Sequence, residues 1–132
     1  KQVNDTRILG IHYHIEENKR LAHIQDEPFY TIQEATLENM QLMFRDYLAD
    51  IICFGHHHPE HNFQAEGKSY LNPGALGVSK GDTAPYGIID LSRNEPNITI
   101  HHAAYDKKAF LEKFDRLQVP QRETLFKLFY TG

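Results

Sequence analysis

Cysteine is almost absent from this sequence, because Cys53 is the single one in 132 residues. It lies inside an apolar run, so we expect a small buried side chain and not half of a disulfide. A reducing, cytoplasmic setting follows from that expectation. No apolar run approaches the ~18 residues that a membrane span needs, and no signal peptide is visible at the N-terminus. These features argue against a disulfide-rich secreted protein and against a membrane protein.

An excess of basic charge is also missing. The chain carries 14 basic and 18 acidic residues, a formal net charge of −4, and no basic cluster. Binding to a nucleic-acid backbone is therefore disfavoured. The length suits one domain with a single core, and there is no internal repeat or low-complexity segment.

Histidine is abundant, with nine in the chain. Three of them follow the apolar run 51–54 and Gly55 as His56-His57-His58. The run is mostly β-branched or aromatic and does not alternate, which predicts a strand covered on both faces. His56 and His58 are two residues apart and would point to the same side of an extended backbone. Imidazole is a common ligand of divalent transition metals, so the loop indicates a metal site; a solvated turn is the alternative.

The segments before this loop predict an α/β arrangement. A strand is expected over 7–11, ending at His12, and an amphipathic helix over 36–48, capped by Thr31 or Thr36. Strand, helix and strand in succession are typical of an α/β layer, in which ligands gather at the carboxyl ends of strands. His12 is therefore the expected partner of the 56–58 loop.

The remaining segments predict a β-meander followed by helices. The fold class is therefore α/β (α+β), with a sheet pair flanked by helices. The other expected elements are a short helix at 19–25, a hairpin of 62–65 and 68–71, a rigid turn at 72–77, a loop at 81–85, strands at 86–91 and 98–105, and helices at 107–117 and 121–129.

Three motifs together resemble a known family. Phe54-Gly55-His56-His57-His58-Pro59, then Leu71-Asn72-Pro73-Gly74-Ala75 after a hairpin, then Tyr86-Gly87-Ile88-Ile89-Asp90 are similar to the C-terminal half of calcineurin-like metallophosphoesterases. The small bacterial and archaeal phosphodiesterases are the most similar members. The resemblance covers roughly residues 7 to 106, and it implies a four-layer αββα sandwich.

The resemblance also implies a cofactor and a ligand set. His12 and His56 would hold one ion and His58 the other, in a centre of two divalent transition-metal ions that share a bridging hydroxide. Manganese is the first expectation, with iron, zinc, nickel or cobalt as alternatives, because neutral imidazoles suit these metals. The implied reaction is hydrolysis of a small phosphoester or nucleotide. His57 is expected to face away from the ions.

Several departures from the family pattern limit this expectation. The family's Asp-x-His, Gly-Asp and Gly-Asn-His motifs do not precede His12, so no catalytic residue is assigned. Tyr13 stands where a glycine is usual and adds bulk beside the site. The chain begins at Lys1, so we expect residues 1–132 to be the C-terminal portion of one metallophosphoesterase domain, with 7–106 as the sheet and metal-loop part and 107–132 as a helical tail. This chain alone is expected to be inactive, poorly soluble or oligomeric.

Other interpretations of the histidines stay open. His14 is an alternative ligand to His12, and the 11–16 segment partly matches the histidine-triad nucleotide hydrolases. The alternative function is that of a degenerate domain, a metal-binding or interaction module without turnover. The remaining histidines are expected to be solvated or to lie at a strand surface; these are His23, His61, His101 and His102.

Overall fold

The computed structural model describes residues 1–13, 32–93 and 95–130, and the chain forms two compact units. The first comprises residues 1–57 and 61–72, and the second comprises residues 58–60 and 73–132. The expected helix at 19–25 and the expected cap Thr31 lie outside the described residues. Among the helices that are described, none is both long and apolar enough to cross a membrane.

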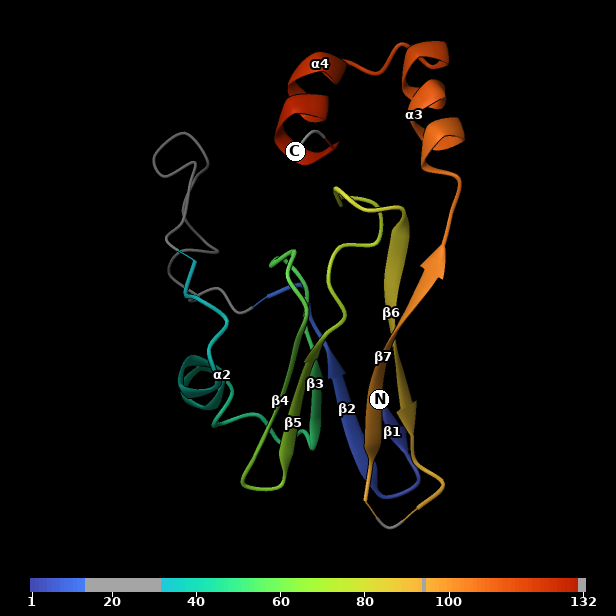
Figure 1. The fold of residues 1–132 in the computed structure, drawn as a ribbon. Helices are drawn as coiled ribbons and strands as arrows, with labels where there is room; N and C mark the ends of the chain where they lie inside the picture. The colour runs from blue at the N-terminus through green and yellow to red at the C-terminus, as the bar shows by residue number, and fades with distance from the viewer. Residues whose placement is uncertain (14–31, 94, 131–132) are drawn as a thin grey trace. The chain divides into compact units, whose positions relative to one another are not determined.

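A five-stranded mixed sheet forms the centre of the first unit (Figure 1). Its order is β1 (Gln2–Val3), β2 (Thr6–Gly10), β3 (Ile51–Cys53), β5 (Lys68–Asn72) and β4 (His61–Ala65). β3 pairs in parallel with both β2 and β5, whereas β1 and β4 are antiparallel to their neighbours. The prediction of a covered strand is confirmed, since the side chains of Ile51 and Ile52 are fully buried.

Helix α2 (Leu37–Met43) packs near β4 (Figure 1). It begins where the sequence predicts, because the Thr36 side chain caps it by accepting from the Asn39 N–H at 3.2 Å. It ends at Met43, so the predicted extension to Leu48 is wrong, and Leu48 is 81% exposed.

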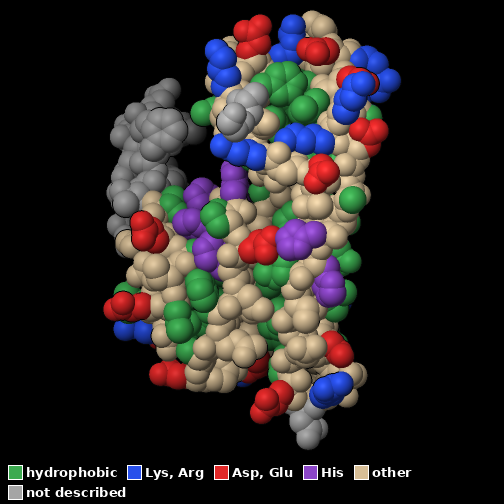
Figure 2. All heavy atoms as spheres, in the orientation of Figure 1, with side chains coloured by type: hydrophobic (Ala, Val, Ile, Leu, Met, Phe, Trp, Pro, Cys, Tyr) green, Lys and Arg blue, Asp and Glu red, His purple; other side chains and the backbone are tan. Residues whose placement is uncertain are grey.

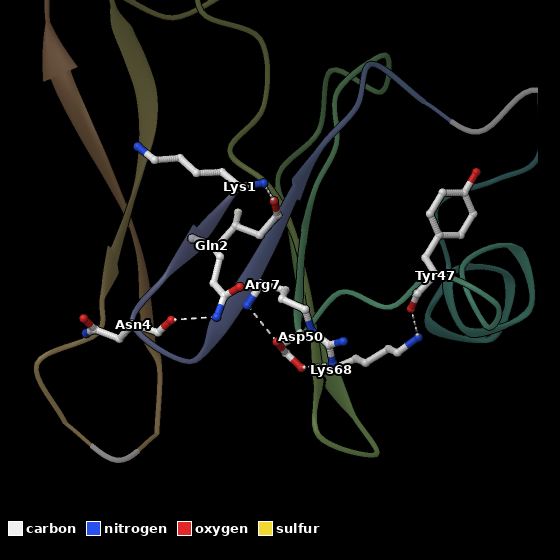
Figure 3. Close-up of polar contacts among 8 residues, drawn as sticks. Lys1, Gln2, Asn4, Arg7, Tyr47, Asp50 and Lys68 are labelled. Atoms are coloured by element: carbon white, nitrogen blue, oxygen red, sulfur yellow. Dashed lines mark hydrogen bonds and ion pairs between the residues drawn. The ribbon is translucent and has the colours of Figure 1, made fainter.

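The early end of α2 has a tertiary cause. Carbonyls in the last turn of a helix have no partner within the helix. Here the Lys68 ammonium, from β5, donates to the carbonyls of Phe44 at 3.0 Å, Arg45 at 3.3 Å and Tyr47 at 2.8 Å. Figure 3 shows the last of these bonds. Lys68 thus binds the C-cap carbonyl and two carbonyls of the turn that follows the helix, where the sequence predicted a further helical turn.

The core of the first unit lies between α2 and the sheet. Met40 and Phe44 of the helix segment are fully buried, as the amphipathic pattern predicts. They join Ile52 and Tyr70 of the sheet and Tyr13 in one apolar cluster. The rings of Phe44 and Tyr70 have centroids 6.3 Å apart. Burial of this apolar surface is the main force holding helix and sheet together.

The β4–β5 hairpin confirms its predicted turn. Glu66 and Gly67 separate the two strands and have φ values of 51° and 75°. Two positive φ values in a two-residue loop match a type I′ turn, whose twist agrees with that of the strands.

The second unit is a long hairpin followed by helices (Figure 1). Strands β6 (Thr83–Asp90) and β7 (Asn97–Ala104) pair in antiparallel register, which confirms the predicted strand pair. β6 begins earlier than expected and includes Pro85 opposite His102. A two-stranded sheet has only edge strands, and edge strands tolerate proline.

Two helical segments follow β7, as predicted. α3 (Lys107–Arg116) begins at Asp106, whose side chain accepts from the Ala109 N–H at 2.8 Å. α4 (Arg122–Leu125) continues into the π-helix η1 (Phe126–Tyr130). Both segments contribute rings to one aromatic cluster, formed by Phe110, Phe114, Phe126 and Tyr130. The α/β class is confirmed, and the four-layer arrangement stays a prediction.

Candidate functional site

His12 and His56 follow two adjacent parallel strands, β2 and β3. Pairing continues beyond the strand ends, because the Ile11 N–H donates to the Cys53 carbonyl at 3.0 Å and the Gly55 N–H donates to the His12 carbonyl at 2.7 Å. The two imidazole rings meet edge to face, with centroids 5.4 Å apart and planes at 87°. Both side chains are exposed. The carboxyl edge of the sheet therefore presents two imidazoles together to solvent.

The backbone at His56 adopts an uncommon conformation. Its φ is 68°, in the left-handed region that few non-glycine residues occupy. Gly55 precedes it, and a Cβ there would lie 3.5 Å from the His12 carbonyl oxygen and 3.6 Å from His12 Nδ1. The absent side chain leaves room for the His12 ring. Such unusual backbone is enriched at functional sites.

Tyr13 forms one wall beside the histidine pair. It is only 4% exposed, and its ring stacks on that of His56 with centroids 5.8 Å apart. Its hydroxyl donates to the Gln33 carbonyl at 2.8 Å, and burial raises the pKa of Tyr13 to about 12. The expected bulk at this position is confirmed. The ring restricts how the His56 imidazole can turn.

His57 makes a different set of contacts from its neighbours. Its Nε2 lies 3.1 Å from the Gln33 carbonyl oxygen, and a carbonyl only accepts, so Nε2 carries the proton in this bond. The ring meets Tyr13 edge to face at 4.8 Å. These contacts support the expectation that His57 is not a ligand, which stays a prediction.

Asn72 was not singled out as a site residue, although its Asn-Pro-Gly motif was noted. Its side chain is fully buried, and its Nδ2 donates to the His57 carbonyl at 2.6 Å. The bond ties the end of β5 to the histidine loop. The Asn-Pro-Gly motif is visible in the sequence. The hydrogen bond from Asn72 to His57, however, depends on how the strands pair, which only the fold shows.

His61 is not solvated, contrary to expectation. It lies at the start of β4, half-buried, against three aromatic rings. The ring centroids of Phe54, His57 and Phe63 lie 6.0, 5.9 and 5.5 Å from its own. The strand alternation places it on the covered side of the hairpin.

His58 belongs to the second unit. The Ala75 N–H donates to its carbonyl at 3.2 Å, and its ring lies 5.7 Å from that of Phe129 in η1. Gly74 has a φ of 97°, and a Cβ there would lie 3.1 Å from the His58 carbonyl oxygen. The glycine turn and the helical tail therefore hold this exposed histidine.

The remaining histidines of the second unit lie on β7, as expected. His101 and His102 are both exposed. The His101 ring stacks on Tyr86 at 5.5 Å. His102 Nε2 lies 2.5 Å from a Glu60 carboxylate oxygen, a partner that the sequence did not indicate. Figure 2 shows a carboxylate directly beside a histidine on the molecular surface.

The histidine pair fits a transition-metal ion as two of its ligands. Nitrogen donors on exposed, adjacent imidazoles match the preferences of manganese, iron, zinc, nickel or cobalt. Across residues 1–13, 32–93 and 95–130, no group of three or more histidine, cysteine, aspartate or glutamate side chains is placed to hold an ion. The alternative ligand His14 lies outside these ranges. Any complete centre therefore needs further donors beside His12 and His56.

Comparison with solved structures places the fold among known proteins. A hypothetical protein from Pyrococcus horikoshii OT3 superposes with a TM-score of 0.70 at 13% identity, over 100% of this chain and 49% of that one. This chain thus spans about half the length of that protein. The zinc complex of Vps29 from Entamoeba histolytica matches with a TM-score of 0.40 at 16% identity, over 55% of this chain and 48% of that one. The latter likeness is too weak to carry an argument.

Comparison at the level of sequence identifies the family. No protein with curated annotation matches this chain. The family model of the calcineurin-like phosphoesterase superfamily domain matches residues 2–94, which include both strand-ending histidines, the 56–58 loop and the Asn-Pro-Gly turn. The chain therefore belongs to the calcineurin-like phosphoesterase superfamily.

Proposed function

We propose that this chain supplies the histidine ligands of a metal-dependent phosphoester hydrolase with a binuclear centre. His12 and His56 would hold one divalent transition-metal ion and His58 the other, with manganese as the first candidate. The remaining donors would come from outside the described residues. The substrate would be a small phosphoester or nucleotide, in a cytoplasmic protein that forms a homo-oligomer.

The observation that carries the proposal is the pairing of His12 with His56 at the carboxyl ends of two parallel strands. Ligands bind at this edge in open α/β sheets. The left-handed backbone of His56 and the buried amide of Asn72 behind the loop support a site that is held in shape. A solvated turn without a bound ligand requires neither the left-handed backbone at His56 nor the buried hydrogen bond from Asn72.

The chemistry follows from the ligand type. Paired metal ions lower the pKa of a bound water and neutralise phosphate oxygens. The chain's own part is to hold the ions: two exposed imidazoles on paired strands, one of them backed by the Tyr13 ring. Tyr13 also covers one side of the pair, which narrows the approach of solvent and substrate.

A second candidate function is metal binding without turnover, as an interaction module. It is favoured by the lack of a third donor next to His12 and His56 in the described ranges. It predicts metal uptake but no hydrolysis with any metal or at any pH.

The test measures metal binding and hydrolysis together. Calorimetric titration with Mn²⁺ and assay of bis(4-nitrophenyl) phosphate are carried out on the complete gene product and on its His56→Ala variant. We expect His56→Ala to lose metal binding by at least about 100-fold and to lose hydrolysis. His57→Ala is the control from the same loop and should retain metal affinity. Wild-type affinity and activity in His56→Ala would overturn the proposal, and binding without hydrolysis in the parent would favour the module.

A further inference from the structure

A cavity of about 260 Å³ lies within the second unit, next to His58. Its polar lining includes the carboxylate of Glu60, the imidazole of His102, and the hydroxyls of Ser79 and Thr83. Glu60 comes from the segment between β3 and β4, whereas His102 comes from β7. Their 2.5 Å contact joins two segments that are far apart in the sequence.

The described residues that line the cavity include one carboxylate, from Glu60. Lysine and arginine are absent from the described residues around this cavity. Glu60 accepts hydrogen bonds, and the hydroxyls of Ser79 and Thr83 both donate and accept. A second phosphate placed here would meet the Glu60 carboxylate, and like charges brought together at a binding surface are strongly unfavourable. The polar groups therefore favour neutral groups that donate hydrogen bonds.

The remaining side chains of the lining are apolar, apart from His58. Pro59, Pro85, Ala75 and Val78 present hydrocarbon to the cavity. The cavity is smaller than the about 300–1,000 Å³ that drug-sized ligands occupy. A mainly polar lining with a few hydrocarbon contacts suits a polyol, which offers hydroxyl edges and C–H faces. One sugar-sized group is the expected occupant.

From these features we infer that the cavity is a specificity subsite for an uncharged, hydroxyl-bearing group of the phosphoester, of the size of glycerol or a pentose. The inference rests on the proposed function, because His58 lines the cavity and is the proposed ligand of the second ion. A phosphate bound there would have its organic group at the mouth of the cavity. Glu60 and His102 select that group by hydrogen bonding and reject one that carries a second phosphate.

The first measurement requires no metal and no turnover. Ribose and ribose 5-phosphate are titrated into the metal-free protein, and the imidazole ¹⁵N resonances of His102 are followed by NMR. We expect saturable shifts with ribose and a Kd at least about tenfold weaker for the phosphorylated sugar. Glu60→Gln keeps the side-chain shape but removes the charge. In this variant, the Kd values of ribose and ribose 5-phosphate should therefore agree to within about twofold. Glu112→Gln, on α3 outside the cavity, is the matched control and should behave as the parent.

The second measurement uses turnover. In the complete gene product and in the same variants of it, kcat/KM is compared for the 4-nitrophenyl phosphodiester of glycerol and for its terminally phosphorylated analogue. The parent should prefer the first by about tenfold, and Glu60→Gln should lose most of that preference. Hydrolysis with the same preference in parent and Glu60→Gln would overturn the subsite. Ribose binding without any hydrolysis would uphold the subsite and overturn the proposed function. Absence of chemical-shift changes at His102 on addition of ribose would overturn the subsite.

Discussion

Asn72 is a buried amide whose side chain joins the Asn-Pro-Gly turn to the histidine loop. It donates to the His57 carbonyl at 2.6 Å from a fully buried position. A carbonyl that loses its donor inside a protein costs the full desolvation of that group. The conformation of the loop therefore depends in part on one buried side chain at the end of β5.

We predict that Asn72→Ala lowers the free energy of unfolding by about 1–3 kcal/mol. It should also weaken Mn²⁺ binding, because the histidine loop loses its anchor. Urea unfolding and calorimetric titration measure the two effects. Asn62→Ala, at an exposed position on β4, is the control. A stability equal to that of the control would show that the bond contributes nothing.

Asp50 provides a charge link between β2 and β3. The backbone N–H of Arg7 donates to its carboxylate at 2.7 Å, and the guanidinium lies 3.4 Å away (Figure 3). The Arg7 N–H, followed by its guanidinium, lowers the pKa of the Asp50 carboxyl. A depressed pKa in the folded state stabilises the fold above the unfolded pKa of about 3.9, and that stabilisation is lost as pH falls through the lower folded value.

Asp50→Asn should therefore destabilise the protein at pH 7 and flatten the acid side of its stability profile below about pH 4. Both side chains are more than a third exposed, so solvent screening limits the effect to about 1 kcal/mol or less. Thermal unfolding between pH 2 and pH 7 measures it. Asp46→Asn, on an exposed pair with Arg45, should leave the profile unchanged; an identical profile for Asp50→Asn would refute the link.

Helix α2 illustrates how one element is ended by another. The Lys68 ammonium, from β5, binds three carbonyls at its carboxyl end. A positive charge at this position also complements the helix dipole. The helix is only seven residues long, and helices so short depend on tertiary contacts for their stability.

Replacing Lys68 by methionine keeps the apolar stem and removes the ammonium. We expect a loss of about 1–3 kcal/mol in unfolding free energy, because three carbonyls lose their donor. Circular dichroism during urea unfolding provides the measurement. Lys108→Met, on the exposed face of α3, should cost within about 0.5 kcal/mol. Equal effects of the two substitutions would mean that the helix terminus does not need Lys68.

The whole chain exposes several large apolar side chains. Leu48, Leu76, Leu117, Leu42 and Leu128 are 62–81% exposed. Single exposed leucines are ordinary, but β1 and β4 also end the sheet, and neither has a second strand partner among the described residues. Open edges and uncovered apolar side chains favour association. By contrast, acidic and basic side chains are interspersed over α3 and α4 (Figure 2). This charge pattern disfavours self-association through these two helices.

We therefore predict concentration-dependent self-association of the 132-residue chain. Sedimentation velocity between about 5 and 200 µM should show an increasing average mass. Added Mn²⁺ at 100 times its Kd should stabilise the fold by about 2.7 kcal/mol if the proposed site is present, and EDTA should reverse this. A monodisperse monomer with one cooperative unfolding transition would contradict the predicted self-association.

Local chemistry in the sequence was enough to identify most elements. The unbroken apolar run predicts the central strand β3, and Glu66-Gly67 predicts the β4–β5 turn because both positions accept positive φ. The same local signals led to the family, because Gly55-His56 and Asn72-Pro73-Gly74 occur in the order that the family pattern has, with a hairpin between them. These features depend on neighbours in sequence, so periodicity and turn chemistry reveal them.

Only the tertiary structure decided the features that depend on residues far apart in the chain. The turn after α2 is held by Lys68, 24 residues from Phe44. β6 includes Pro85 because β6 is itself an edge strand of a two-stranded sheet. The partner of His102 is Glu60, 42 residues away, and no local pattern reveals such a pair. The sequence by itself determined the strands, the turns, the histidine motif and His12 as its expected partner. The edge-to-face geometry of His12 and His56, the anchor at Asn72 and the cavity beside His58 needed the fold, because hydrogen bonds and packing act through space.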